Sequence, residues 1–131
     1  MASLFTKIIQ GEIPCYKIAE NENFFAFLDI YPLKKGHTLV IPKTEIDYIF
    51  DLDNELLSDY LVFSKEIATA IERVIPCKRV GIAVLGLEVP HAHIHLIPID
   101  ELGDTNFERP KLEFSDEEFQ EIAEEIREAL K

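Results

Sequence analysis

The segment 89–98 reads Val-Pro-His-Ala-His-Ile-His-Leu-Ile-Pro and contains three of the four histidines in this chain of 131 residues. His91, His93 and His95 alternate with single apolar residues, which is the period of a β-strand. The three imidazoles are therefore expected on one face of the strand, with the apolar side chains on the opposite face. Such a concentration of imidazoles calls for a chemical explanation.

A row of histidines on a strand has three interpretations: a solvated strand face, a metal site, or a site for phosphate chemistry. Residues two apart on a strand are about 6.6 Å apart, so the backbones of His91 and His95 are about 13 Å apart. Because a zinc ion needs ligand nitrogens at about 2.1 Å, two neighbouring histidines could share an ion, but all three would be strained. A phosphoryl group has several oxygens, which a row of imidazoles can contact without converging on one point. The spacing therefore favours phosphate chemistry, and a metalloprotein is left as an alternative.

Composition indicates an ordinary globular protein in one domain, residues 1–131, with 47% hydrophobic and 29% charged residues. The net charge of −12 argues against binding to nucleic acid. No apolar run has the length of a membrane span, and the first residues lack the features of a signal peptide. Cys15 and Cys77 are far apart and form no paired motif, so a reduced, cytoplasmic setting is expected.

Hydrophobic periodicity predicts three helices. The first covers residues 3–10, and the long one covers about residues 52–75 and ends at Pro76. The third begins with a capping box at residues 115–118, and its acidic side chains are expected to form a solvated face. Tyr60, on the long helix, is expected to be a core or rim residue rather than a catalytic one.

Alternation or short apolar runs predict strands at residues 15–19, 24–29, 37–43, 78–85 and 89–98. Their links are short, which indicates a largely antiparallel sheet and an α+β fold. His37 opens the strand 37–43, so all four histidines lie on two predicted strands and meet if those strands pair. Asp29 follows the apolar run 24–28, where an acidic residue is most often a cap or turn former.

The chain resembles members of the histidine triad (HIT) family. The resemblance lies in the complete run His-Ala-His-Ile-His-Leu-Ile at 91–97 and in the segments 5–14, 27–30 and 36–43. It implies a five-stranded antiparallel sheet with one long helix and short flanking helices, usually in a dimer whose sheets join. The core of this HIT-like domain is expected at about residues 3–98. Residues 101–131, a loop and an acidic C-terminal helix, are not matched to that core.

The activity implied by the resemblance is hydrolysis or transfer at the α-phosphate of a nucleotide. By position, His93 matches the nucleophile, which forms a nucleotidyl-histidine that water then hydrolyses. His91 and His95 match residues that contact phosphate oxygens or the leaving group, and the carbonyl of His91 is expected to orient the His93 ring. His37 matches a fourth histidine of the cluster, and Asp29 matches the acid that holds the ribose hydroxyls. The apolar wall around the base is matched by Leu4, Ile8, Leu28 and Ile30.

The connection before the histidine segment departs from the family pattern. It is shorter, and residues 84–90 contain neither the Asn nor the Gln that is common there. Gly86 keeps room for a close backbone approach, whereas Leu87 stands in place of a phosphate-contacting Gln. Glu88 stands in place of a small hydroxyl residue and is expected to repel an anionic substrate.

These features together predict a cytoplasmic hydrolase that cleaves a purine nucleotide, either a nucleoside phosphoramidate or a dinucleoside polyphosphate, through a nucleotidyl-His93. No cofactor or metal is expected, and Ser3 and Thr6 stand where some relatives carry the cysteines of a zinc element. The expected partners are the nucleotide and a second copy of the chain, in a homodimer. The alternative is a nucleotide-binding or protein-interaction module on the same fold with little turnover, which Leu87 and Glu88 favour.

Overall fold

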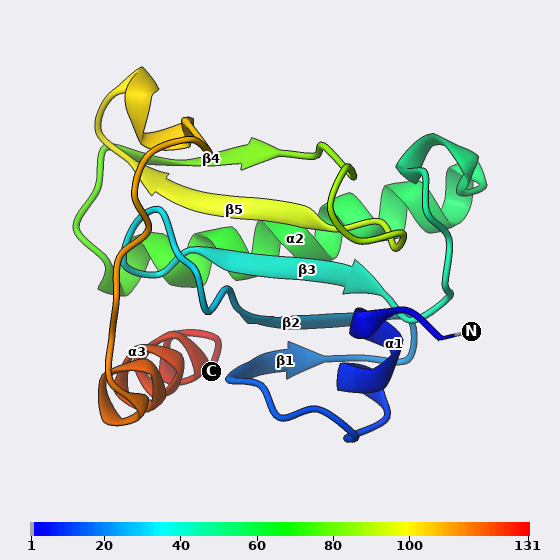
Figure 1. Ribbon diagram of the computed structural model, residues 1–131, viewed down its shortest axis with the longest axis horizontal. Helices are drawn as coiled ribbons and strands as arrows, with labels where there is room; N and C mark the ends of the chain where they lie inside the picture. Colours follow the sequence, from blue (N-terminus) through cyan, green and yellow to red (C-terminus); the bar gives the residue numbers. More distant parts are fainter. Residues whose placement is uncertain (1) are drawn as a thin grey trace.

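The computed structural model describes residues 2–131, and its centre is a five-stranded antiparallel sheet in the order β1-β2-β3-β5-β4 (Figure 1). The strands are β1 (Lys17–Glu20), β2 (Phe24–Leu28), β3 (Thr38–Pro42), β4 (Arg79–Ala83) and β5 (Ile94–Ile99). The helices are α1 (Leu4–Ile9), α2 (Asn54–Val74) and α3 (Asp116–Ala129), with short 3-10 helices at Ile49–Asp51 and Leu102–Thr105. The predicted α+β fold with one long helix is confirmed.

Each α-helix begins where a side chain accepts a hydrogen bond from a free backbone N–H of the first turn. Ser3, Asp53 and Ser115 supply these acceptors, and Ser115 does so in the predicted capping box. Because Asp53 is the cap, the long helix begins at Asn54 and not at the predicted residue 52. Among residues 2–131, no helix, α2 included, combines the length and the apolar composition that crossing a membrane requires.

The three central strands, β2, β3 and β5, are buried on both faces, and consecutive residues of β2 point to opposite sides. Phe24, Ala26 and Leu28 belong to the main core with α2 and α3, whereas Phe25 and Phe27 belong to a smaller core with residues of α1. Figure 1 shows α2 crossing behind the sheet and α1 lying on the near face. Since α1 has only six residues, it covers only part of that near face.

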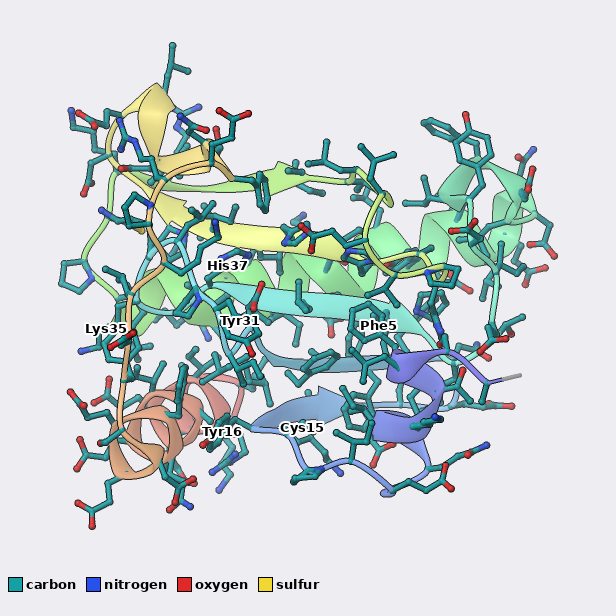
Figure 2. The ribbon with its side chains drawn as sticks, in the orientation of Figure 1. Phe5, Cys15, Tyr16, Tyr31, Lys35 and His37 are labelled. Carbon is teal, nitrogen blue, oxygen red and sulfur yellow. The ribbon has the colours of Figure 1, made fainter. Side chains whose placement is uncertain are left out.

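The acidic C-terminal helix, for which the sequence suggested no packing partner, packs against α2 and β1. Figure 2 shows Tyr16 between β1 and α3. The ring of Tyr16 stacks on Phe119 with a centroid distance of 4.8 Å, and its hydroxyl donates to Asp116 at 2.7 Å. The apolar residues of α3 complete the main core, while the carboxylates of α3 remain in solvent as predicted.

The histidine segment differs from the predicted strand 89–98, because β5 begins only at Ile94. The strand prediction is therefore wrong for residues 89–93. The backbone N–H of Ala92 donates to the carbonyl of Ile46 at 2.7 Å, so this part of the chain bonds to the loop after β3 and not to a strand.

The predicted division of the histidine segment into two faces is confirmed. Ile94 and Leu96 lie in the main core. The rings of His93 and His95 are 5.0 Å apart between centroids, and His93 is also 5.0 Å from the ring of Phe5 in α1. The imidazoles therefore lie on the α1 side of the sheet.

Tyr60 of α2 determines where β5 begins. Its side chain is fully buried, and its hydroxyl donates to the carbonyl of Val40 in β3 and accepts from the backbone N–H of Ile94 at 3.1 Å. Because a hydroxyl both donates and accepts, one side chain satisfies a backbone group on each of two strands at the end of their ladder. The expectation that Tyr60 is a core residue is confirmed.

We predict that Tyr60→Phe lowers the free energy of unfolding by about 1–3 kcal/mol, because two buried backbone groups lose a partner. Tyr16→Phe is the matched control, since its hydroxyl bonds an exposed carboxylate, and its effect should stay within about 0.5 kcal/mol. Urea denaturation followed by circular dichroism measures both values. Equal effects of the two substitutions would contradict the bridging role of Tyr60.

Candidate functional site

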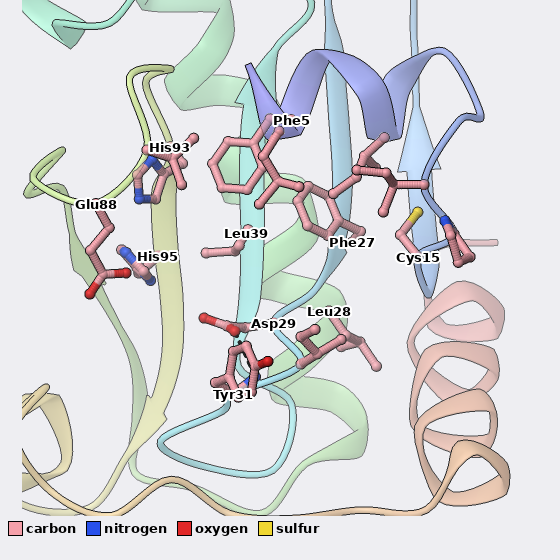
Figure 3. Close-up of a pocket in the computed structure, with 16 residues that line it drawn as sticks. Phe5, Cys15, Phe27, Leu28, Asp29, Tyr31, Leu39, Glu88, His93 and His95 are labelled. Carbon is pink, nitrogen blue, oxygen red and sulfur yellow. Dashed lines mark hydrogen bonds between the residues drawn. The ribbon is translucent and has the colours of Figure 1, made fainter. Parts of the chain in front are cut away.

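A pocket of about 240 Å³ opens on the α1 side of the sheet, between α1, β2 and the histidine segment (Figure 3). It is lined by Leu4, Phe5, Ile8, Ile13, Pro14, Cys15, Phe27, Leu28, Asp29, Ile30, Tyr31, Leu39, Glu88, Val89, His93 and His95. Figure 3 shows the two histidines and Glu88 on one side, the aromatic rings opposite, and Asp29 at one end. The pocket thus joins an apolar wall to a small set of polar groups, as binding sites for small molecules do.

The structure brings most of the predicted site residues to this pocket. The four predicted wall residues, together with Asp29 and Glu88, line it beside His93 and His95. Gly86 and Leu87 do not; they line a separate groove by α2 and β4, where Leu87 is 92% exposed. The connection turns at Gly86 with a φ of 74°, and only Glu88 and Val89, after this turn, line the pocket.

Only one neutral tautomer of the His93 ring fits its hydrogen bond. Its Nδ1 lies 2.8 Å from the carbonyl oxygen of His91, and a carbonyl only accepts, so Nδ1 carries the proton. The other ring nitrogen, Nε2, therefore holds a lone pair. The ring lines the pocket and is 4% exposed, and the edge contact with Phe5 fixes its tilt. This arrangement gives the pocket a nucleophile or base with a defined direction.

His37 and His95 form a hydrogen-bonded pair whose proton positions are set by the backbone. The N–H of Leu33 donates to Nδ1 of His37 at 3.0 Å, so the proton of neutral His37 lies on Nε2. That Nε2–H donates to Nδ1 of His95 at 2.9 Å. Neutral His95 must then carry its own proton on Nε2, which makes it a hydrogen-bond donor.

Burial keeps this pair uncharged. It lowers the pKa of His37 to about 3, with further lowering by the charges of His95 and Lys111. It lowers the pKa of His95 to about 4, with a smaller contribution from His93. At neutral pH both rings are therefore neutral, and the bond pattern of the pair does not change with a small change of pH.

Asp29 lies at the end of β2, where one of its carboxylate oxygens accepts from the N–H of Tyr31 at 2.8 Å. Its other oxygen is 3.5 Å from Nε2 of His37. Burial raises the pKa of Asp29 to about 6, the hydrogen bond from Tyr31 opposes this, and the charge of Glu88 adds to it. Because His37 is neutral, the two side chains do not form an ion pair.

Among the described residues, Asp29, His37 and His95 have potential metal ligand atoms within 4.8 Å of one another. The hydrogen bonds of His37 argue against an ion there. A neutral imidazole whose Nδ1 accepts an amide proton carries its own proton on Nε2 and cannot also coordinate through it. That this site works without a metal therefore stays a prediction, with this physical support.

His91 has a different surrounding from the one implied by the resemblance. Its ring is fully buried outside the pocket, with Nε2 at 2.7 Å from the carbonyl oxygen of Pro42 and Nδ1 at 2.7 Å from Oγ of Ser3. The expected contact of its ring with phosphate is thus not supported by its position. The expected contact of its carbonyl with His93 is present at 2.8 Å.

Two residues that affect the site, Phe107 and Lys111, come from the segment 101–114, which the sequence predicted to be a loop. The ring of Phe107 lies edge-on at 4.7 Å from His95 and 6.3 Å from His37, between centroids. The ammonium of Lys111 donates to the carbonyl of Phe107, and its charge lowers the pKa values of Asp29 and His37. No sequence motif marks these residues, because they reach the site through tertiary packing alone.

Comparisons with known proteins identify the family of this chain. The sequence model described as HIT domain matches residues 10–102, which include all four histidines and Asp29. A HIT-like protein of Borreliella burgdorferi is 37% identical over 94% of each chain, and the adenosine 5'-monophosphoramidase of Schizosaccharomyces pombe is 37% identical over 100% of each. A Hit-like protein structure from Bartonella henselae matches with a TM-score of 0.84 at 30% identity, over 97% of this chain and 95% of that one. From its fold, its clustered histidines and these full-length relatives, this chain belongs to the histidine triad (HIT) family.

Proposed function

We propose that this protein hydrolyses a nucleoside phosphoramidate at its α-phosphate, through a nucleotidyl-histidine on Nε2 of His93. The observation that carries the proposal is the bond from Nδ1 of His93 to the carbonyl of His91, which leaves Nε2 unprotonated in the pocket. Membership of the family supports a nucleotide hydrolase. The relative in Schizosaccharomyces pombe, named an adenosine 5'-monophosphoramidase, supports the choice of substrate class.

The pocket offers a separate place for each part of a purine nucleotide. The apolar wall suits the base, since flat heteroaromatic rings bind well between aliphatic and aromatic side chains. The carboxylate of Asp29 accepts hydrogen bonds from the ribose hydroxyls at the open end of the wall. The α-phosphate then lies beside His93, with the Nε2–H of His95 available to a phosphate oxygen.

The reaction proceeds in two displacements. In the first, Nε2 of His93 bonds to phosphorus, and the bond from phosphorus to the leaving nitrogen breaks as that nitrogen takes a proton from solvent. In the second, water bonds to phosphorus and gives a proton to solvent, and the bond from phosphorus to Nε2 of His93 breaks, which releases the nucleoside monophosphate and free His93. Nδ1 of His93 keeps its proton throughout, so the carbonyl of His91 faces a ring that becomes more positive in the intermediate and binds it more strongly.

The charge of the site favours a leaving group without negative charge. Figure 3 shows the carboxylate of Glu88 beside His95, and the charge of Glu88 reaches Asp29 across the pocket mouth. A phosphoramidate releases an amine, whereas a dinucleoside polyphosphate releases an anion that these two carboxylates repel. Of the two substrate classes that the sequence leaves open, we therefore propose the phosphoramidate.

The exposed edge of β4 supports the homodimer that the resemblance implies. A groove beside this strand, lined with residues of β4 and α2 and the Gly86 loop, has a volume of about 610 Å³. Its lining includes six exposed apolar side chains: Tyr48, Phe50, Leu61, Ile82, Leu85 and Leu87. Apolar patches of this kind on a free strand edge are typical of interfaces between proteins. We propose that a second copy of the chain covers this groove and extends the sheet through β4.

We predict that the wild type releases AMP from adenosine phosphoramidate faster than from diadenosine tetraphosphate. His93→Ala should lower the rate by roughly a thousandfold or more, because no nucleophile remains. Chromatographic measurement of AMP formation tests both statements. Equal rates for wild type and variant would remove the catalytic role of His93, and equally slow rates would leave the nucleotide-binding module as the function.

We predict that adenosine binds more weakly in acid because Asp29, with a pKa of about 6, loses its charge. Its raised pKa means that the carboxylate is mostly ionised at pH 7.5 and mostly protonated at pH 5. If only the ionised form accepts both ribose hydroxyls, the dissociation constant should rise about tenfold at pH 5. Titration calorimetry measures this. Asp29→Asn, and 2',3'-dideoxyadenosine on the wild type, should show no such rise, and the same rise in either would exclude the ribose contact.

We predict that Ile82→Glu converts the dimer into a monomer, because it places a carboxylate in the proposed interface, where burial of an unpaired charge is costly. Thr69→Glu adds the same charge to an exposed position of α2 outside the groove and should leave the dimer intact. Light scattering after size-exclusion chromatography gives the masses. A monomeric wild type, or a dimeric Ile82→Glu, would contradict this interface.

A further inference from the structure

A hydrogen-bonded cluster lies beside the pocket, at the beginning of α1. It consists of Ser3, Thr6, Glu45 and His91, and none of the four lines the pocket. One oxygen of Glu45 accepts from the backbone N–H of Ser3 at 2.5 Å and from the hydroxyl of Thr6 at 2.7 Å. These bonds hold the carboxylate ionised, since they lower the pKa of Glu45 to about 2. An exposed glutamate is thereby fixed against a helix end.

Ser3 connects this cluster to the ring of His91 through its side-chain hydroxyl. Its Oγ accepts from the N–H of Thr6 at 3.0 Å, so its hydroxyl proton is available for Nδ1 of His91 at 2.7 Å. Nε2 of His91 donates to the carbonyl of Pro42 at 2.7 Å, which leaves Nδ1 as the acceptor in the neutral ring. Both ring nitrogens are therefore held by the protein, and neither is available to a ligand.

The backbone of the same residue holds the nucleophile. The carbonyl of His91 accepts from Nδ1 of His93 at 2.8 Å. The backbone N–H of His91 donates to the carbonyl of Val89 at 2.8 Å. The backbone N–H of Ala92 donates to the carbonyl of Ile46 at 2.7 Å. Since residues 89–93 lie outside the sheet ladder, these bonds and the clamped ring are what fix the direction of that carbonyl.

We propose that Glu45, Ser3 and Thr6 are positioning residues that act through His91 to aim Nε2 of His93 at phosphorus. This proposal rests on the function proposed above. The chain of contacts runs from the carboxylate of Glu45 through the start of α1 to the ring of His91, and from its carbonyl to His93. Because α1 also supplies Leu4, Phe5 and Ile8 to the apolar wall, the same cluster ties the wall to the nucleophile.

The test uses Ser3→Ala and Glu45→Ala, each of which removes one link without touching the pocket. We expect kcat on adenosine phosphoramidate to fall about ten- to a hundredfold, because a small misplacement of a reacting atom has effects of that size. The dissociation constant of AMP should change less than about threefold, because the wall and Asp29 remain. Ser3→Thr keeps a hydroxyl and Glu45→Gln keeps one acceptor oxygen, so both should recover much of the lost rate.

Glu12→Ala is the matched control, because it removes an exposed carboxylate just after α1 that makes no side-chain hydrogen bond among the described residues. It should leave kcat unchanged. A purely structural effect of Ser3→Ala on α1 would lower stability and weaken AMP binding together, which thermal unfolding and calorimetry would reveal. Glu45 is exposed, so its substitution separates positioning from folding.

The second readout does not need turnover. In ¹⁵N-histidine-labelled protein, the ring of His93 should show a single Nδ1–H tautomer in the wild type and a mixture in Ser3→Ala and Glu45→Ala. Unchanged ring signals, an unchanged kcat, or a loss of AMP affinity equal to the loss of kcat would each overturn the proposal. A wild type without turnover would remove the proposed function alone, and the ring signals would still decide whether the cluster positions His93.

Discussion

The antiparallel pairing of β3 with β5 is the contact on which the rest of the site depends. It sets Leu39 opposite His95, and His37, two residues before Leu39, thereby comes within hydrogen-bond distance of His95. β3 ends at Pro42, whose carbonyl accepts from the ring of His91. One strand therefore fixes both ends of the histidine segment. A slip of one residue in this register would turn His95 toward the main core.

Backbone groups decide where the protons of the four imidazoles lie, directly for His37, His91 and His93 and through His37 for His95. The amide of Leu33 donates to His37, and the carbonyls of Pro42 and His91 accept from His91 and His93. Because an amide N–H only donates and a carbonyl only accepts, each ring has one permitted neutral form. Burial then disfavours the charged forms of the rings that lie deepest. The lone pair and the donor of the site are thus oriented before any substrate arrives, which is the form of electrostatic preorganisation that lowers barriers.

The alternation of residues 91–96 was sufficient to predict that the imidazoles and the apolar side chains face opposite ways, because extended backbone turns successive side chains to opposite sides even before β5 begins at Ile94. The start of β5 could not be predicted, since it is determined by the hydroxyl of Tyr60 on a distant helix. The surroundings of His91 could not be predicted either. Its partner Ser3 is 88 residues away in the chain, and a serine at a helix start has a sufficient local reason to be there as a cap. Local patterns predict which face of an element is buried and which residue caps a helix. The additional bond of Ser3 to His91 depends on tertiary structure, which a local pattern does not contain.

Phe107 covers the outer side of the His37–His95 pair, and its segment is attached to the domain by the bond from the N–H of Leu112 to the carbonyl of Pro32 at 2.8 Å. This segment lies outside the residues that the HIT domain matches. Part of the dehydration that keeps these imidazoles uncharged is thus supplied by residues beyond the end of that match. The affinity of the His37–His95 pair for protons therefore depends on this C-terminal segment, because exposing the two rings to water would raise their pKa values toward that of free imidazole.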